Sequence, residues 1–323
     1  MKYLKSSFLA KIALVLAASG VGACGGRIDA PIPTDPDDLG STGTSGSGPG
    51  ASAPEDLWLV FDVTTGKDAG LHTVRPDGTG LRCLGLPTTA RSPAFSRDGN
   101  RLAFAGSGGI FTYDLLTRRT VQVTFGADNV PAWSPDGRRL AFTRGLDVRT
   151  LDLATRTEQS IAVGPPPGQE WYSNYGHPTF APDGNAVWFS RRGAIESRSL
   201  LGDDPRVLLS ASYGAPMVST SDDGAAAAVS VECEGRGGTS IISTLPNAVS
   251  TACSAGTPVG RALTWTRPAI HSTGEVAYVS SMHTIDARGQ AGLSPVKIVD
   301  TRQSLGGGYV GEVAWARRGG MLP

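Results

Sequence analysis

Residues 131–142 read PAWSPDGRRLAF, and this stretch decides the fold because it recurs along the chain. Close copies read PAFSRDGNRLAF at 93–104 and PTFAPDGNAVWF at 178–189. Weaker copies begin at residues 216, 268 and 313, so successive copies start 38 to 52 residues apart. Repeats of about 40–50 residues that contain several short strands are typical of propeller blades.

Each copy predicts two strands joined by a tight turn. The Asp-Gly pair supplies the backbone conformation that such turns require. The second strand is apolar at consecutive positions, as in residues 140–142, which favours a sheet covered on both faces. A third strand follows after glycines, as at 110–114, and an edge strand follows at 120–124. Four strands per repeat make one blade.

The two ends of the repeat array complement each other. Residues 57–85 hold three strands without a leading strand, whereas the copy at 313 supplies only a leading strand. Joined in one sheet, they complete a sixth blade and protect the terminal strand edges. We therefore expect an all-β, six-bladed β-propeller over residues 55–323 with an N-/C-terminal composite blade. An open sandwich with accidental repeats is the alternative.

The N-terminus has the layout of a secretory signal over residues 1–23. A short apolar run follows a basic start and ends in small residues before Cys24. This segment resembles the bacterial lipoprotein signal, which implies acylation of Cys24; ordinary cleavage after Ala23 would instead release a free protein. Gly25 stands where an Asp retains many lipoproteins on the inner membrane, which favours the outer membrane.

Residues 24–54 predict a tether between this anchor and the propeller. Gly, Pro, Ser and Thr dominate the stretch from 25 to 54, and it contains no aromatic residue. Such a composition buries too little apolar surface to offset the entropy of ordering. The expected location is the cell envelope, with the propeller in the periplasm or at the cell surface.

The repeat resembles the TolB-type propeller repeat, whose core is Pro-x-aromatic-Ser-Pro-Asp-Gly-x-x-Leu-Ala-Phe. Residues 131–142 match this core, and the resemblance covers about 57–323. Similar propellers occur in the periplasmic Tol–Pal translocation protein and as the non-catalytic part of prolyl-peptidase-like enzymes. In the Tol–Pal protein an α/β domain precedes the propeller, whereas here the tether occupies that place.

Charge and motif content argue against several functions. The 29 basic and 29 acidic residues cancel, so nucleic-acid binding is not expected. The segment around Ser107 resembles a nucleophile elbow only superficially, because no helix pattern follows it. We expect no enzyme activity, cofactor or metal. The aspartates that recur before the turn glycines fit turn chemistry better than calcium binding; they are Asp98, Asp136, Asp183 and Asp223.

Three cysteines remain if Cys24 is acylated, and an exported protein meets an oxidising compartment. Cys233 and Cys253 fall in one predicted blade, so we expect a disulfide between them, with two separate thiols as the alternative. Cys83 is then left over.

Propellers usually bind at the mouth of the central channel, through the loops that lead into each innermost strand. Residues 164–177, GPPPGQEWYSNYGH, form the longest and most aromatic of these loops. The alternative is that its aromatic residues form a lid that packs over a blade end. The candidate binding residues are Arg91, Asn129, Trp171, Tyr172, Asn174, Tyr175, His177, Tyr213, Arg267 and Glu312.

These observations predict a membrane-anchored, non-catalytic scaffold that binds an envelope protein or peptide. The alternative is a small-ligand or glycan-binding propeller, possibly a lyase or hydrolase, with its site in the central funnel. Converging polar residues at the channel mouth would favour this alternative, and a flat apolar rim would favour the scaffold.

Overall fold

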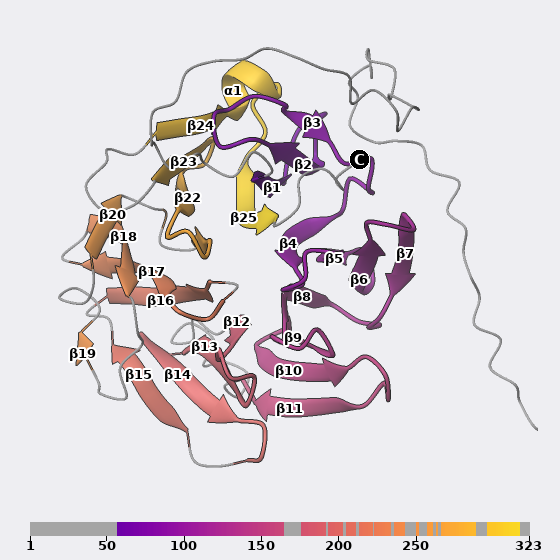
Figure 1. Ribbon diagram of the computed structural model, residues 1–323, viewed down its shortest axis with the longest axis vertical. Helices are drawn as coiled ribbons and strands as arrows, with labels where there is room; N and C mark the ends of the chain where they lie inside the picture. Colours follow the sequence, from indigo (N-terminus) through magenta and orange to yellow (C-terminus); the bar gives the residue numbers. More distant parts are fainter. Residues whose placement is uncertain are drawn as a thin grey trace, which may run out of the picture.

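The computed structural model shows a β-propeller, as the repeats predict (Figure 1). No helix in the part of the chain that it describes is long and apolar enough to cross a membrane. The described residues are 57–164, 176–191, 193–202, 205–210, 213–221, 223–233, 236–242, 250–251, 257–260, 263, 266–288 and 296–316. The predicted signal segment and tether lie outside them.

Within these residues the strands form six sheets arranged around a ring (Figure 1). Three of the sheets, each written from its innermost strand outward, are β25-β1-β2-β3, β4-β5-β6-β7 and β8-β9-β10-β11. Their strands are β1 (Trp58–Val63), β2 (Gly70–Val74), β3 (Arg82–Cys83), β4 (Arg91–Phe95), β5 (Arg101–Gly106), β6 (Gly109–Asp114), β7 (Arg119–Gln122), β8 (Asp128–Trp133), β9 (Arg139–Arg144), β10 (Asp147–Asp152), β11 (Glu158–Ala162) and β25 (Val310–Ala316).

The other three sheets are β12-β13-β14-β15-β19, β16-β17-β18-β20 and β21-β22-β23-β24. Neighbouring strands pair antiparallel except β15 and β19. The remaining elements are β12 (Gly176–Phe180), β13 (Ala186–Arg191), β14 (Ala194–Ser199), β15 (Arg206–Ser210), β16 (Tyr213–Thr220), β17 (Ala227–Cys233), β18 (Arg236–Ile242), β19 (Ser250–Thr251), β20 (Thr257–Gly260), β21 (Ala269–Ile270), β22 (Val276–Ser281), β23 (Thr284–Arg288), β24 (Val296–Asp300) and the one-turn helix α1 (Thr301–Ser304).

The turns after four innermost strands, β4, β8, β12 and β16, are each held by an aspartate of the turn. Ser134 donates from Oγ to Oδ1 of Asp136 at 2.6 Å, and the same carboxylate oxygen accepts the N–H of Arg138 at 3.0 Å. Gly137 adopts a φ of +66°, which favours glycine at this position. The backbone N–H bond recurs at Asp98, Asp183 and Asp223. The serine bond recurs at Asp98 and Asp223, so turn chemistry accounts for these carboxylates.

The two ends of the repeat array share one sheet. Strand β25 pairs antiparallel with β1, with Leu59 opposite Trp315 and Val60 opposite Ala314. Residues 57–85 therefore obtain their innermost strand from the C-terminal part of the chain.

The core lies between neighbouring sheets. Leu140, Ala141 and Phe142 of β9 are all fully buried. Leu140 and Phe142 pack in a cluster with Ile110 of the preceding sheet, whereas Ala141 packs with Phe189 of the following sheet. Consecutive apolar residues are required because each inner sheet face is covered by another blade. The segment around Ser107 is the short turn that joins β5 to β6, where Gly106 pairs with Gly109.

Candidate binding site in the central channel

Six innermost strands surround the axis of the ring. Strand β25 contacts β4, and the contacts continue through β8, β12, β16 and β21 back to β25. Each of these strands ends one of the sheets at its inner side (Figure 1). Side chains that point inward from them therefore meet across the channel.

Three innermost strands carry the same backbone irregularity. Ser92, Val130 and His177 each precede a repeat proline and have φ values of 50°, 49° and 53°. This left-handed conformation is costly for residues other than glycine, about 1–3 kcal/mol, and especially unusual for the β-branched Val130. The strand register shifts at each of these positions, as in a β-bulge. Bulges redirect side chains at the rim of a sheet, and strain of this kind concentrates at functional sites.

Three of the candidate residues meet around the buried carboxylate of Glu312. Nε2 of His177 lies 3.1 Å from Oε1 of Glu312, and Nε of Arg267 lies 3.5 Å from Oε2 of the same carboxylate. These residues come from β12, from the segment before β21 and from β25. Burial alone raises the pKa of Glu312, but the nearby His177 and Arg267 outweigh burial, so the pKa lies below its usual value.

Arg267 also connects the cluster to two further backbone segments. Its guanidinium donates from one terminal nitrogen to the carbonyl oxygen of Pro178 at 3.1 Å and from the other to that of Pro131 at 3.5 Å. The side chain is buried. One guanidinium therefore joins the inner strands of three sheets across the channel, which closes its centre with a charged group.

Asp62 of β1 extends this network and was not among the predicted site residues. Its Oδ1 accepts the N–H of Glu312 at 2.6 Å and that of Ser92 at 3.4 Å, and its Oδ2 lies 4.0 Å from Nε of Arg91. Burial raises the pKa of Asp62 to about 7, against the lowering effect of the hydrogen bond from Glu312. The available sequence signal was an aspartate inside an otherwise apolar strand, LWLVFDV.

Arg91 and Asn129 lie near this network but serve the protein backbone. Arg91 donates to the carbonyl oxygens of Thr88 and Ala90 at 2.6 and 2.8 Å, and to that of Thr64 at 3.0 Å. Oδ1 of Asn129 accepts the N–H of the following residue at 3.0 Å. Arg91 therefore fixes the loop before β4, and Asn129 supports the backbone of β8 at Val130.

The aromatic loop is only partly described. Trp171, Tyr172, Asn174 and Tyr175 lie outside the described residues, and Tyr213 is placed at the start of β16 without its side chain. Their role at the channel mouth stays a prediction.

The structure changes the expected state of Cys83. Cys83, at the end of β3, is disulfide-bonded rather than left over. Cys24 and Cys253 lie outside the described residues, and Cys233 is placed at the end of β17 without its side chain. Because the chain has four cysteines, the partner of Cys83 is Cys24, Cys233 or Cys253. Acylation of Cys24 and a Cys233–Cys253 bridge are therefore incompatible with each other when Cys83 is bonded.

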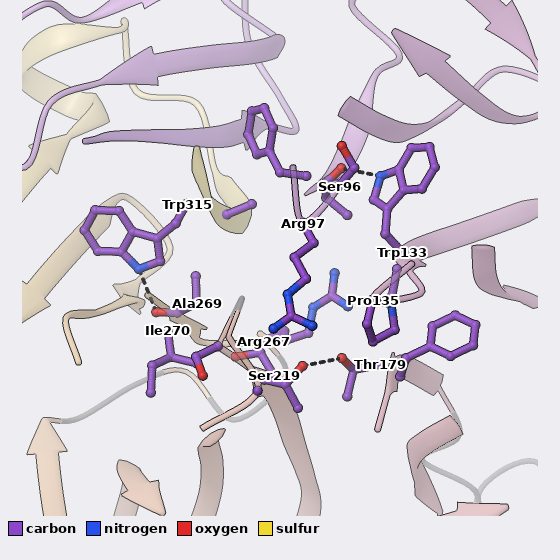
Figure 2. Close-up of a pocket in the computed structure, with 18 of the residues that line it drawn as sticks. Ser96, Arg97, Trp133, Pro135, Thr179, Ser219, Arg267, Ala269, Ile270 and Trp315 are labelled. Carbon is purple, nitrogen blue, oxygen red and sulfur yellow. Dashed lines mark hydrogen bonds between the residues drawn. The ribbon is translucent and has the colours of Figure 1, made fainter. Parts of the chain in front are cut away.

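A cavity of about 160 Å³ lies on the channel axis, on the side of Arg267 that faces the Asp-Gly turns (Figure 2). Each innermost strand contributes at least one small residue to its wall, which leaves the space open. These residues are Ala94, Ala132, Thr179, Ser219, Ala269 and Ala314. Trp133 and Trp315 also line the cavity, and their indole N–H groups donate to the carbonyl oxygens of Ala94 and Ala269, both at 3.0 Å. These bonds hold the cavity walls in place.

No group of three or more His, Cys, Asp or Glu side chains within the described residues is arranged to hold a metal ion. The charged groups of the channel instead bind one another and the backbone.

No family model and no curated protein matches the sequence. Among solved structures, TolB from Acinetobacter baumannii superimposes with a TM-score of 0.62 at 18% identity, covering 80% of this chain and 66% of the TolB chain. The chain has a TolB-type propeller fold. A chain of a nidogen/laminin complex matches equally well in shape, with a TM-score of 0.61 at 12% identity, covering 80% of this chain and 98% of that one. At these identities the likeness shows that this TolB-type propeller shares its fold with both structures. What it binds has to be inferred from its own residues.

Proposed function

We propose that this TolB-type propeller is a non-catalytic scaffold that binds a segment of an envelope protein at the mouth of its channel. The observation that carries the proposal is the meeting of His177 from β12, Arg267 from the segment before β21 and Glu312 from β25 at one carboxylate in the channel. Buried charged groups contribute little net stability, because desolvation offsets their attraction. A cluster of this kind on a rigid ring is better explained by recognition than by folding.

The proposed location is the cell envelope, with the chain anchored through an acylated Cys24 and the outer membrane favoured over the inner one. The tether of residues 24–54 would then allow the propeller to reach a partner in the periplasm or at the cell surface. The composition of residues 1–54 supports this part of the proposal.

Binding of a small ligand in the funnel is the second candidate function, which includes a glycan-binding or lyase-type propeller. Its support is the convergence of polar residues on the axis and the cavity beside them, rather than a flat apolar rim. The scaffold should bind an envelope protein or peptide, whereas the second candidate should bind a small molecule or a glycan.

Affinity capture from envelope extract tests the scaffold. The wild type is compared with a variant that carries Trp171→Ala and Tyr175→Ala, and with Leu201→Ala, which removes a 91% exposed apolar side chain from the loop between β14 and β15, outside the loops that lead into the innermost strands. A partner captured by the wild type and by Leu201→Ala, but lost with the double variant, supports the proposal. Identical sets of captured proteins in all three samples would contradict it.

A further inference from the structure

The axial cavity has aromatic walls and room for a single ring. Its volume is about 160 Å³, and an apolar cavity of about 150 Å³ accommodates a benzene-sized molecule. The aromatic residues of the lining are Phe95, Trp133, Phe180 and Trp315. Each indole has one N–H donor, and both tryptophans give it to a backbone carbonyl. The aromatic walls therefore offer a ligand apolar contact rather than hydrogen bonds.

The charges around the cavity do not favour a charged ligand. The lining includes two arginines, Arg97 and Arg267, and none of its described residues is acidic. The guanidinium of Arg267 is compensated by the carboxylate of Glu312, at 3.5 Å. Arg97 likewise interacts within the protein. An anion would compete with these existing contacts and a cation would be repelled by the guanidinium groups, so the lining suits an uncharged ligand.

One hydroxyl group on the wall has no partner. Oγ of Ser219 in β16 is buried and makes no hydrogen bond. The nearby hydroxyl groups of Thr179 and Thr220 differ, because they lie 3.4 Å from each other. A buried polar group without a partner costs free energy that a ligand hydroxyl recovers, since a hydroxyl can both donate and accept. A sugar would leave most of its hydroxyl groups unpaired against these walls, whereas a ligand with one polar group would not.

We propose that this cavity binds an uncharged ring of benzene size that carries one hydroxyl group, the chemistry shared by a free phenol and by the side chain of a tyrosine. The aromatic walls would contact the ring, and Ser219 would pair with its hydroxyl group. The inference rests on the second candidate function, to which it gives a ligand class. The cavity faces the Asp-Gly turns, whereas the 164–177 loop leads into the opposite end of β12, so this site is separate from the proposed partner surface.

Titration of the wild-type protein with matched ring compounds tests the proposal. Phenol and toluene have nearly the same size and differ in the hydroxyl group; benzoate, benzylamine and glucose supply an anion, a cation and a polyhydroxylated ligand. Isothermal titration calorimetry should show phenol binding at least about threefold more tightly than toluene, the size of one neutral hydrogen bond, and more tightly than the other three. Without a hydrogen-bonding group in the cavity toluene would bind better, because an unpaired hydroxyl is costly to bury.

A smaller preference for phenol over toluene, tighter binding of benzoate, benzylamine or glucose, or no binding of phenol would overturn the proposal. Glucose binding alone would still leave the second candidate function standing. N-acetyltyrosinamide separates the two sources of the ring: binding at least as tight as that of phenol supports a tyrosine side chain, and exclusion of this compound while phenol binds supports a free small molecule.

Three variants locate the binding in the cavity. Ser219→Ala should weaken phenol binding about threefold to tenfold and leave toluene binding unchanged, because it removes only the hydrogen-bonding group. Ala314→Leu enlarges a side chain of the cavity wall and should block both ligands. Ser160→Ala removes a hydroxyl group from an exposed residue of the outer strand β11 and should leave both affinities unchanged.

Unaltered phenol binding in both cavity variants would overturn the assignment to this cavity. If either variant fails to fold by circular dichroism, the comparison of phenol with toluene on the wild-type protein decides. Because these experiments use no protein partner, their failure leaves partner capture at the other mouth untouched.

Discussion

Glu312, near the C-terminal end of the described chain, faces His177 from the opposite half of the ring, with Nε2 of the imidazole 3.1 Å from Oε1 of the carboxylate. Arg267 approaches the second oxygen of the same carboxylate. A single buried acid thus neutralises a guanidinium and orients an imidazole, so its removal should affect the whole centre of the channel.

Glu312→Gln should destabilise the protein by about 3–5 kcal/mol, because it leaves the charge of Arg267 buried without compensation. Urea unfolding measures this change. Glu158→Gln is the matched control, since Glu158 pairs with Arg144 and Arg149 at the surface and exposed pairs contribute about 0–1 kcal/mol. Similar losses of unfolding free energy in the two variants would show that the Glu312 carboxylate contributes no more to stability than a surface ion pair does.

The raised pKa of Asp62 leads us to predict a specific pH dependence of the free energy of unfolding. Its pKa rises from 3.8 to about 7 on folding, so the folded state holds the proton more tightly than the unfolded chain does. The resulting stabilisation is fully present below about pH 4 and is lost as the pH rises through 7, by up to about 1.4 kcal/mol per pH unit.

Asp62→Asn should remove this slope, which urea unfolding at several pH values between 4 and 8 measures. The pKa of Glu312 is lowered on folding, so its ionised carboxylate stabilises the protein and that stabilisation is lost only as the pH falls below the usual titration range of a glutamate. Glu312 therefore does not mask the effect of Asp62 near pH 7. Parallel pH profiles for wild type and variant would rule out protonation of Asp62 in this window.

Leu140 tests the packing between blades. Leu140→Ala should cost about 2–5 kcal/mol, because the side chain is fully buried between two sheets. Leu116→Ala removes the same atoms from a side chain that is 70% exposed, and should change the free energy of unfolding by no more than about 0.5 kcal/mol. The difference between the two values from urea unfolding is the contribution of the inter-blade position.

The identity of the cysteine bonded to Cys83 decides whether Cys24 can be acylated and whether a Cys233–Cys253 disulfide can form. If Cys24 carries lipid, non-reducing peptide mapping should join Cys83 to Cys233 or Cys253, and the Cys233–Cys253 bridge should be missing. If Cys24 is joined to Cys83, the Cys24→Ser variant should partition as the wild type does, and neither should gain mass from lipid. Alkylation of Cys83 in the unreduced native protein would contradict its bonded state.

The repeats were sufficient to predict the propeller because each copy encodes local features: an Asp-Gly turn, a doubly covered strand and an edge strand. The pairing of β25 with β1 also followed from local patterns, since one end lacked the strand that the other end carried. Local patterns of this kind survive in a single sequence without knowledge of contacts.

The chemistry of the channel was harder to predict. The loops before the repeat prolines pointed to His177, Arg267 and Glu312, but not to their contact, which depends on three segments distant in sequence meeting across the ring. Asp62 was missed because its partners are backbone N–H groups that only ring closure brings near. Pairing of Cys83 likewise depends on tertiary arrangement rather than on spacing along the chain.

The measurement that tests the binding account most directly is the affinity of the captured partner for wild-type protein and for the Trp171→Ala, Tyr175→Ala double variant, taken together with both melting temperatures. Truncation of interface anchors commonly costs 2 kcal/mol or more, which corresponds to about thirtyfold in the dissociation constant. We predict at least this loss of affinity with a melting temperature close to that of the wild type. Unchanged affinity with a large drop in melting temperature would instead show that these aromatic residues form a structural lid, and would contradict binding at this mouth of the channel.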